Sequence, residues 1–255
     1  MRSTGQQAAD FIKVLSKTLK DNNLGHIGIN CCDSTGWQIA GQVAGQIKSS
    51  GAEDLLYAIT SHEYTSRLGS PISTKAKVWE TEYCDLNGQW TAAWYGNGGA
   101  GDGWTWAMNV YNSLTRSNVN AYLYWEAVQS TAINGNVNEK LIKIDNGNYE
   151  VSKRLWAFAQ WSRFVRPGAV RVGTSGQGVT TSAFKNVDGS LAVQVLNSGS
   201  AQTVSFTTEG FNATKVTAWL TDNKNDLVST PATLGTDGAV SGSVPSRAMV
   251  TFLLS

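Results

Sequence analysis

The first two thirds of the chain alternate between apolar residues at helical spacing and short apolar runs. Helical spacing predicts an amphipathic helix over about residues 3–22, where Ala8, Phe11, Leu15 and Leu19 share one face. The same spacing predicts a second helix carrying Ile39, Val43 and Ile47, and further helices over 104–114 and around Leu155, Trp156 and Phe158. Apolar runs predict strands at 26–32, 55–60, 78–83 and 121–125.

Strands and helices that alternate along a chain indicate parallel strands joined by right-handed crossovers. Beyond Pro167 the pattern changes to short alternating strands between Gly, Asn and Asp turns, at 191–196, 204–206, 216–220 and 249–253. This part predicts an antiparallel β-sandwich. We therefore expect an α/β domain over residues 1–166 and a β-sandwich side domain over 167–255.

Four parallel strands are half of what a (β/α)8 TIM barrel contains. Such a barrel needs about 250 residues for itself, whereas here the sandwich begins near residue 167 and the chain opens on a helix with no strand before it. We expect the C-terminal half of a barrel, equivalent to its strands five to eight. The competing interpretation is a complete four-stranded doubly wound domain, but no Gly-rich phosphate loop follows any of the strands.

Composition narrows the class of partner. Ten Trp occur with many Gly and few charged side chains, and the net charge is +1. Flat rings stack on sugars and short polar side chains bond their hydroxyls, so this mixture is typical of carbohydrate-active proteins, although any single Trp is more often simply part of the core. Without a basic stripe we expect no nucleic-acid or membrane partner.

The cysteines and the N-terminus carry little information. Cys31 and Cys32 are adjacent and Cys84 is remote, a count and spacing that suggest neither a disulfide framework nor a metal site. No apolar run reaches the length of a membrane span, and the first residues lack the apolar core of a signal peptide.

Two carboxylates stand out on one predicted strand. Glu80 and Glu82 are two residues apart, so an ideal strand points both to the same side, with Glu82 nearer the carboxyl end where barrel active sites lie. A buried carboxylate is costly unless it is paired or has a chemical task. Geometry leaves open whether Glu82 is catalytic or structural, and it favours Glu80 less.

Three segments resemble the fungal enzymes of glycoside hydrolase family 30. They are Trp79–Tyr83, Tyr122–Trp125 and the long run Ser152–Ala169, which is the most specific of the three. The resemblance extends from the first helix to the end of the sandwich. It implies a barrel with a β-sandwich side domain and a secreted, retaining polysaccharide hydrolase that needs no cofactor and no metal.

The resemblance also implies a catalytic pair. Glu82 matches the nucleophile, and the acid/base glutamate of the family stands in an Asn-Glu-Pro motif that this sequence lacks; Asn138-Glu139-Lys140 follows the eighth-strand motif and cannot take its place. We therefore expect a chain that is inactive by itself, with the general acid/base missing together with the first half of the barrel.

Further residues are expected along the sugar cleft. His62 and Tyr64 match a His-X-Tyr pattern near the nucleophile, and Trp125 matches a stacking platform, with a satisfied core His as the alternative for His62. Loop residues Asp33, Trp37, Trp94 and Tyr95 are subsite candidates for which loop packing is an equal alternative.

The expected partner is a polysaccharide or oligosaccharide, and the complete protein is expected to be a monomer. Xylan is the favoured substrate, because the loop at residues 94–103 resembles that of the xylanases of the family. Two alternatives stay open: an endo-β-1,6-galactanase, and a carbohydrate-binding fragment without turnover.

Overall fold

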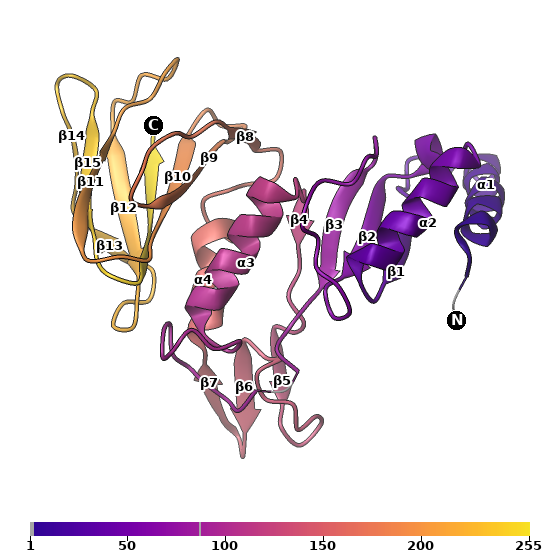
Figure 1. Cartoon of the computed structure of the whole chain (residues 1–255), viewed down its shortest axis with the longest axis horizontal. Coiled ribbons are helices and arrows are strands. Elements are labelled where there is room, and N and C mark those ends of the chain that lie inside the picture. The colour runs from indigo at the N-terminus through magenta and orange to yellow at the C-terminus, as the bar shows by residue number, and fades with distance from the viewer. Residues whose placement is uncertain (1–2, 87) are drawn as a thin grey trace. The chain divides into compact units, whose positions relative to one another are not determined.

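The structure is a computed structural model that describes residues 3–86 and 88–255 (Figure 1). The chain divides into two compact units. The first contains the chain up to Cys84 together with Val110–Trp125, and the second contains Asp85–Asn109 together with Glu126–Ser255. The domain boundary that the sequence predicts at residue 166 stays a prediction, because this division follows packing and cuts the chain more than once.

A four-stranded parallel sheet organises the first unit. Its order is the order of the chain, β1-β2-β3-β4. The strands are β1 (Asn30–Ser34), β2 (Ala58–His62), β3 (Lys77–Glu82) and β4 (Ala121–Tyr122). The helices are α1 (Gly5–Asp21), α2 (Trp37–Ser49), the 3₁₀ turn η1 (Glu53–Leu55) and α3 (Gly103–Arg116), the last of which spans both units. Parallel strands place all their carboxyl ends at one edge, where a barrel carries its site.

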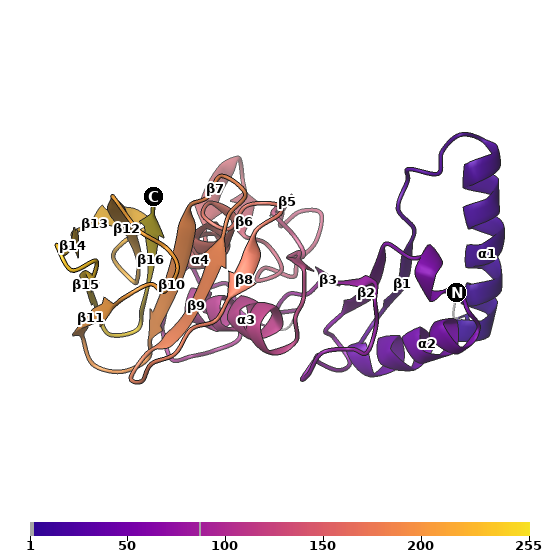
Figure 2. The ribbon, with the colours of Figure 1, turned by 90° about the horizontal axis from the view of Figure 1, so that it is seen from above.

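The helices begin and bury themselves for identifiable reasons. Thr4 and Gln7 form a capping box at the start of α1. Ala9 and Ile12 of α1 pack with Ile47 of α2 and with β1 in one apolar cluster, and Figures 1 and 2 show α2 lying against the strands. The predicted apolar face of α1 was partly wrong, because Phe11 is 64% exposed.

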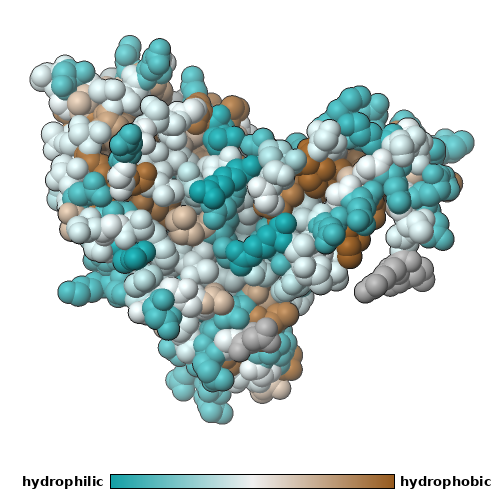
Figure 3. All heavy atoms as spheres, in the orientation of Figure 1, coloured by the Kyte–Doolittle hydropathy of each residue, from teal (hydrophilic) through white to brown (hydrophobic). Residues whose placement is uncertain are grey.

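The same holds for α2. Trp37, Ala40 and Ala44 make its contact with β2 and β3, whereas Ile39, which the spacing placed inward, is 42% exposed. Figure 3 shows hydrophobic side chains at the surface over this helix. The spacing therefore located both helices but displaced their buried faces.

The alternation of strand and helix fails once. Residues 63–76 connect β2 to β3 without a helix. Three predicted strands also change: β1 begins at Asn30, Leu55 belongs to η1, and β4 stops at Tyr122. The change at β4 is one of regularity, because the backbone N–H of Leu123, just past the strand, still donates to the carbonyl of Glu80 at 2.8 Å.

The second unit contains a small sheet that the sequence did not reveal. It is made of β5 (Val128–Ser130), β6 (Ile142–Asp145) and β7 (Asn148–Val151), in the order β5-β6-β7. Asn146 and Gly147, both at positive φ, form the tight turn between β6 and β7. Strands of three or four residues are too short for a period of two to be distinct from chance.

The predicted β-sandwich is present. A six-stranded sheet in the order β13-β12-β16-β10-β9-β8 faces a three-stranded sheet, β11-β15-β14, across one apolar cluster that includes Val193, Val250 and Phe252. The strands are β8 (Val170–Val172), β9 (Thr180–Lys185), β10 (Leu191–Asn197), β11 (Gln202–Phe206), β12 (Val216–Thr221), β13 (Val228–Thr230), β14 (Ala232–Leu234), β15 (Val240–Val244) and β16 (Ala248–Leu254).

Helix α4 (Lys153–Ser162) packs on this sandwich. Trp161 meets Phe184 edge-on, with ring centroids 6.3 Å apart. The contact is not purely apolar, since the buried amide of Gln160 donates to the carbonyl of Trp219 at 3.1 Å and to Oγ1 of Thr221 at 2.9 Å. A polar tie of this kind fixes the helix on the sheet in one register.

Candidate active site

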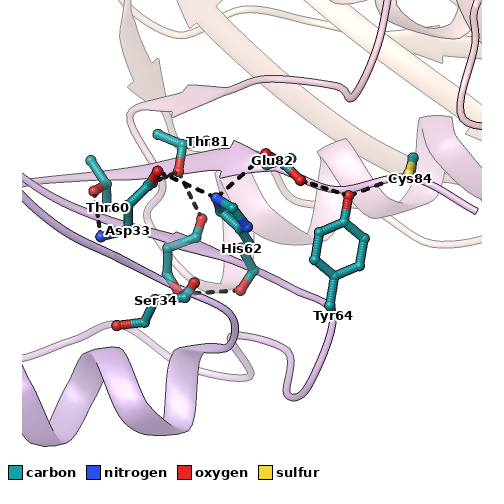
Figure 4. Close-up of polar contacts among 9 residues, drawn as sticks. Asp33, Ser34, Thr60, His62, Tyr64, Thr81, Glu82 and Cys84 are labelled. Atoms are coloured by element: carbon teal, nitrogen blue, oxygen red, sulfur yellow. Dashed lines mark hydrogen bonds and ion pairs between the residues drawn. The ribbon is translucent and has the colours of Figure 1, made fainter. Parts of the chain in front are cut away.

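Glu82 is the last residue of β3, and two aromatic side chains from the end of β2 reach its carboxylate (Figure 4). The hydroxyl of Tyr64 donates to Oε1 of Glu82 at 3.1 Å. Nε2 of His62, the last residue of β2, lies 3.7 Å from Oε2. One carboxylate oxygen therefore accepts a hydrogen bond and the other faces the imidazole, at the carboxyl edge of the sheet.

His62 lies between two acidic side chains. The same Nε2 atom that faces Glu82 is 3.4 Å from Oδ2 of Asp33, near the end of β1. The His62 side chain is largely covered while that of Asp33 is mostly exposed. Figure 4 shows Asp33, His62 and Glu82 converging from three neighbouring strands. Three residues that the sequence nominated separately are thus brought together.

Two irregularities in the sheet occur at this edge. Along the β1–β2 pair the register passes from Cys32 to Ser34 and leaves out Asp33. Along the β2–β3 pair it passes from Glu80 to Glu82 and leaves out Thr81. An extra residue of this kind is a β-bulge, which bends the strand and re-aims a side chain. The regular alternation of side chains between the two faces of the sheet, which was assumed for Glu80 and Glu82, is therefore interrupted at Thr81.

A second carboxyl group lies buried in the sheet next to the exposed one. The Glu80 side chain is fully buried, and its Oε2 accepts a 2.6 Å hydrogen bond from Nε1 of Trp37. Burial raises the pKa of Glu80 to about 9, although the Trp37 indole opposes the shift. Burial also raises the pKa of nearby Glu63. Glu80 is therefore a neutral acid at neutral pH, without access for a substrate.

Tyr64 carries a second polar contact. Its hydroxyl oxygen lies 3.3 Å from Sγ of Cys84, a buried residue two positions after Glu82. Burial, with the neighbouring thiol and carboxylate, raises the pKa of Tyr64 well above its usual value. The phenol consequently keeps its proton throughout the physiological range and remains a donor to Glu82.

The aromatic candidates separate into exposed and buried rings. Trp125 follows β4, the residue is 43% exposed, and its backbone N–H donates to the carbonyl of Tyr83 at 3.3 Å. Trp37 and Trp94 are buried, the first against Glu80 and the second with Nε1 donating to the carbonyl of Arg247. A buried ring offers no face to a sugar, so the subsite role expected for these two is corrected.

Tyr95 belongs to the second unit, as Trp94 does. The Arg247 guanidinium lies over its ring at 4.7 Å, and the amide of Asn223 holds the backbone of the loop on both sides of it. This loop is tied to the sandwich, which accounts for its order without any ligand. The role of Tyr95 at a sugar subsite stays a prediction.

The cysteines differ from the sequence-based expectation. The structure joins Cys31 and Cys32 by a disulfide. The third cysteine, Cys84, is a free thiol buried beside Tyr64, so Cys31 and Cys32 can pair only with each other. Among the described residues there is no cluster of His, Cys, Asp and Glu that could hold a metal ion, and no helix there has the length and apolar character of a membrane span.

Comparison with known proteins defines the family. Residues 2–163 match the model of glycosyl hydrolase family 59, and residues 168–252 match that of the glycosyl hydrolase family 30 beta sandwich domain. The solved catalytic domain of family 30 xylanase C from Talaromyces cellulolyticus matches both parts, with 41% sequence identity and a TM-score of 0.92, over 100% of this chain and 58% of that chain. The chain belongs to glycoside hydrolase family 30. The prediction of a partial TIM barrel followed by a β-sandwich is thereby confirmed.

Two further relatives are more distant. The glucuronoxylanase XynC of Bacillus subtilis is 26% identical over 157 residues, which are 58% of this chain and 33% of that protein. The family 30 xylanase Xyn30A of Clostridium acetobutylicum has the same fold, with a TM-score of 0.79 at 20% identity, over 99% of this chain and 61% of that chain. The segment that matches XynC thus covers about a third of that protein's length.

Sequence reasoning missed two residues of the site. Thr81 donates to Oδ1 of Asp33 at 2.5 Å, and Cys84 contacts Tyr64. A threonine between two glutamates looks like an outward-facing strand residue, and no pattern in one sequence marks a bulge. The signal for Cys84 was stronger, because it is two residues from Glu82 on the same segment.

Proposed function

We propose that this chain provides the nucleophile and part of the sugar cleft of a secreted, retaining glycoside hydrolase that cleaves xylan. One observation carries the proposal: the Glu82 carboxylate stands at the carboxyl edge of the parallel sheet with one oxygen bonded by Tyr64 and the other facing His62. Family membership supports the reaction class, and the named xylanases among the relatives support the substrate.

The chemistry follows from the carboxylate. Glu82 attacks the anomeric carbon, the glycosidic bond breaks, and its oxygen leaves with a proton from an acid; water then cleaves the glycosyl ester and regenerates the carboxylate. The Tyr64 hydroxyl, which stays protonated, donates to Oε1 and so restricts rotation of the carboxylate. Exposed Trp125 supplies a platform on which a sugar ring stacks.

The acid of this reaction is the missing part. A retaining pair of carboxyl groups stands about 5–5.5 Å apart, and Glu80, the other glutamate of β3, is buried and bonded to Trp37. The sequence contains no Asn-Glu-Pro. We therefore propose that these 255 residues alone do not turn over a polysaccharide, and that a separate segment must bring the acid/base carboxyl.

The test uses a substrate that needs no acid. A 2,4-dinitrophenyl β-xylobioside has a leaving group that departs as a stable anion, so Glu82 should displace it without proton transfer. A 2-fluoro substituent slows the second step and preserves the ester. We expect release of one equivalent of dinitrophenolate and a mass increase of one glycosyl group on the peptide that contains Glu82.

Two variants make the result specific. Glu82→Gln should give no adduct and should still bind xylo-oligosaccharides, since the lost atom acts by bonding to carbon. Glu150→Gln, at a surface carboxylate of β7, should label like the original chain. An adduct on another residue would refute the assignment of Glu82, and labelling by a β-1,6-galactobioside but not by the xylobioside would favour a galactanase.

A further inference from the structure

Asp33 and Thr81 connect two strands that are not neighbours in the sheet. They come from β1 and β3, which lie on either side of β2. Oγ1 of Thr81 lies 2.5 Å from Oδ1 of Asp33 and 3.1 Å from the carbonyl of Ser61 on β2. Figure 4 shows the Thr81 and Asp33 side chains meeting next to His62. The two residues therefore form a bridge across the middle strand.

Both ends of the bridge are residues that the sheet register leaves out. Asp33 adopts φ +53°, a left-handed conformation that only Gly, Asn and Asp adopt at low cost. Its backbone N–H donates to Oγ1 of Thr60 at 3.1 Å, so the conformation is held from β2 as well. Two bulges that face one another across a strand indicate that the edge of the sheet is shaped for these two side chains.

The remaining oxygen of Asp33 faces His62. Oδ1 accepts from Thr81, while Oδ2 is 3.4 Å from Nε2 of His62, the atom that also faces Glu82 at 3.7 Å. Thr81 fixes the carboxylate by one oxygen and so aims the other at the imidazole. An exposed aspartate without such a hydrogen bond would rotate freely in solvent and would not keep the imidazole in place.

We propose that Asp33 and Thr81 are positioning residues: together they hold the imidazole of His62, with its Nε2–H directed toward the carboxylates, at the side of Glu82. Asp33 is then part of the support of the catalytic edge and does not serve as a sugar contact. The catalytic meaning of this support rests on the proposed function of Glu82, but the support itself can be measured without any turnover.

The measurement is proton exchange at the His62 ring by NMR. The chain has two histidines, and His26 is exposed, so it serves as an internal reference. Carboxylates held against a ring N–H slow its exchange with water, so loss of that support should speed the exchange about tenfold or more. We expect a visible ring N–H signal for His62 and none for His26.

The variants separate the bridge from the overall fold. Asp33→Asn tolerates the left-handed conformation but has one oxygen for two donors, so it should accelerate exchange at His62 about tenfold. Thr81→Val should do the same, and Thr81→Ser, which restores the hydroxyl, should return the original rate. Thr233→Val and Asp10→Asn, at exposed positions of β14 and α1, should leave it unchanged.

The outcomes exclude one another. Unchanged exchange at His62 in Asp33→Asn and in Thr81→Val, in folded chains judged by thermal unfolding, would overturn the proposal. Weaker binding of xylo-oligosaccharide in Asp33→Asn without faster exchange would overturn it too and would make Asp33 a sugar contact. Failure of Glu82 to form a glycosyl adduct would refute the proposed function and would leave the exchange result standing.

Discussion

The indole N–H of Trp37 donates to the buried carboxyl of Glu80 across 2.6 Å, joining the first residue of α2 to the middle of β3. Glu80 has no exposed surface, and its second oxygen, Oε1, has no hydrogen-bond partner among the described residues. A carboxylate in this position would be poorly solvated, so the neutral acid is the stable form.

Glu80 should make stability depend on pH. Its pKa is raised from 4.5 in the unfolded chain to about 9 in the folded one. Between these values the unfolded chain releases a proton that the folded chain keeps, so rising pH favours unfolding. We expect the free energy of unfolding to fall by up to about 1.4 kcal/mol per pH unit over this interval and to level off above it. Urea unfolding at several pH values measures the slope.

Glu80→Gln resembles the neutral acid in shape and cannot ionise. The variant should lose most of this slope and should be more stable than the original chain at pH 8.5. Buried Glu63, whose pKa is also raised, would account for a residual slope. The matched control is Glu209→Gln at an exposed position, which should keep the original dependence. An unaltered slope in Glu80→Gln would contradict the burial argument.

Tyr64→Phe tests the hydrogen bond on Glu82. The substitution removes the 3.1 Å contact to Oε1 and the contact to Cys84 with little change in volume. Loss of a hydrogen bond to a charged group costs about 1.5–3 kcal/mol, equivalent to about a 10–100-fold drop in the rate of glycosyl transfer to Glu82. Release of dinitrophenolate from the activated xylobioside measures this rate.

Tyr57→Phe is the matched control for Tyr64→Phe. Tyr57 precedes β2, at the opposite end of the strand, and its hydroxyl accepts from Nζ of Lys77 at 2.6 Å. The rate should not change in this variant. Equal losses in both variants would attribute the effect to general destabilisation of the sheet.

Gln160 should be a main stabilising residue of the second unit. Its buried side chain donates to the Trp219 carbonyl and to Thr221, and its Oε1 accepts from Oγ1 of Thr251 at 2.6 Å. Gln160→Leu keeps the volume and leaves these partners unsatisfied, at a cost of about 1–3 kcal/mol. Chemical unfolding followed by tryptophan fluorescence measures it. Gln177→Leu, at an exposed loop position, should cost far less.

Much of the fold could be read from the sequence because its long elements repeat a period. The four parallel strands and the four helices all overlap the segments predicted for them, although three of the strands have other bounds, and the long sandwich strands β10, β12 and β16 lie where they were predicted. The small sheet β5-β6-β7 could not be read, since its strands are held by pairing that no local pattern records. The sequence predicted which face of a helix is buried less well than it predicted where the helix lies, as the exposed side chains of Phe11 and Ile39 show.

The site was predictable where it depends on strand ends and not where it depends on side-chain packing. The position of Glu82 near the carboxyl edge follows from the rule that barrel sites lie where parallel strands end, whereas His62 and Asp33 were proposed from the resemblance to the family. The contact between Asp33 and Thr81 depends on two bulges, and the interior position of Trp37 depends on a carboxyl 43 residues away in the chain. Such long-range contacts exist only after folding, so a single sequence cannot show them.

Two substrates should separate the nucleophile from the missing acid on the same chain. When xylan is cleaved, the glycosidic oxygen of the departing segment leaves as an alkoxide unless an acid protonates it, and loss of general acid catalysis lowers the rate about 10²–10⁴-fold. Dinitrophenolate leaves as a stable anion and needs no proton. We therefore expect the 255 residues to react with the activated xylobioside while hydrolysing xylan and β-1,6-galactan at less than about one hundredth of the rate of a complete family relative. Addition of the N-terminal half of such a relative should raise hydrolysis of xylan and leave the reaction with the activated substrate nearly unchanged. Efficient hydrolysis of xylan by the chain alone would mean that an acid is present among its own residues, and Asp33 would then be the first carboxyl to test.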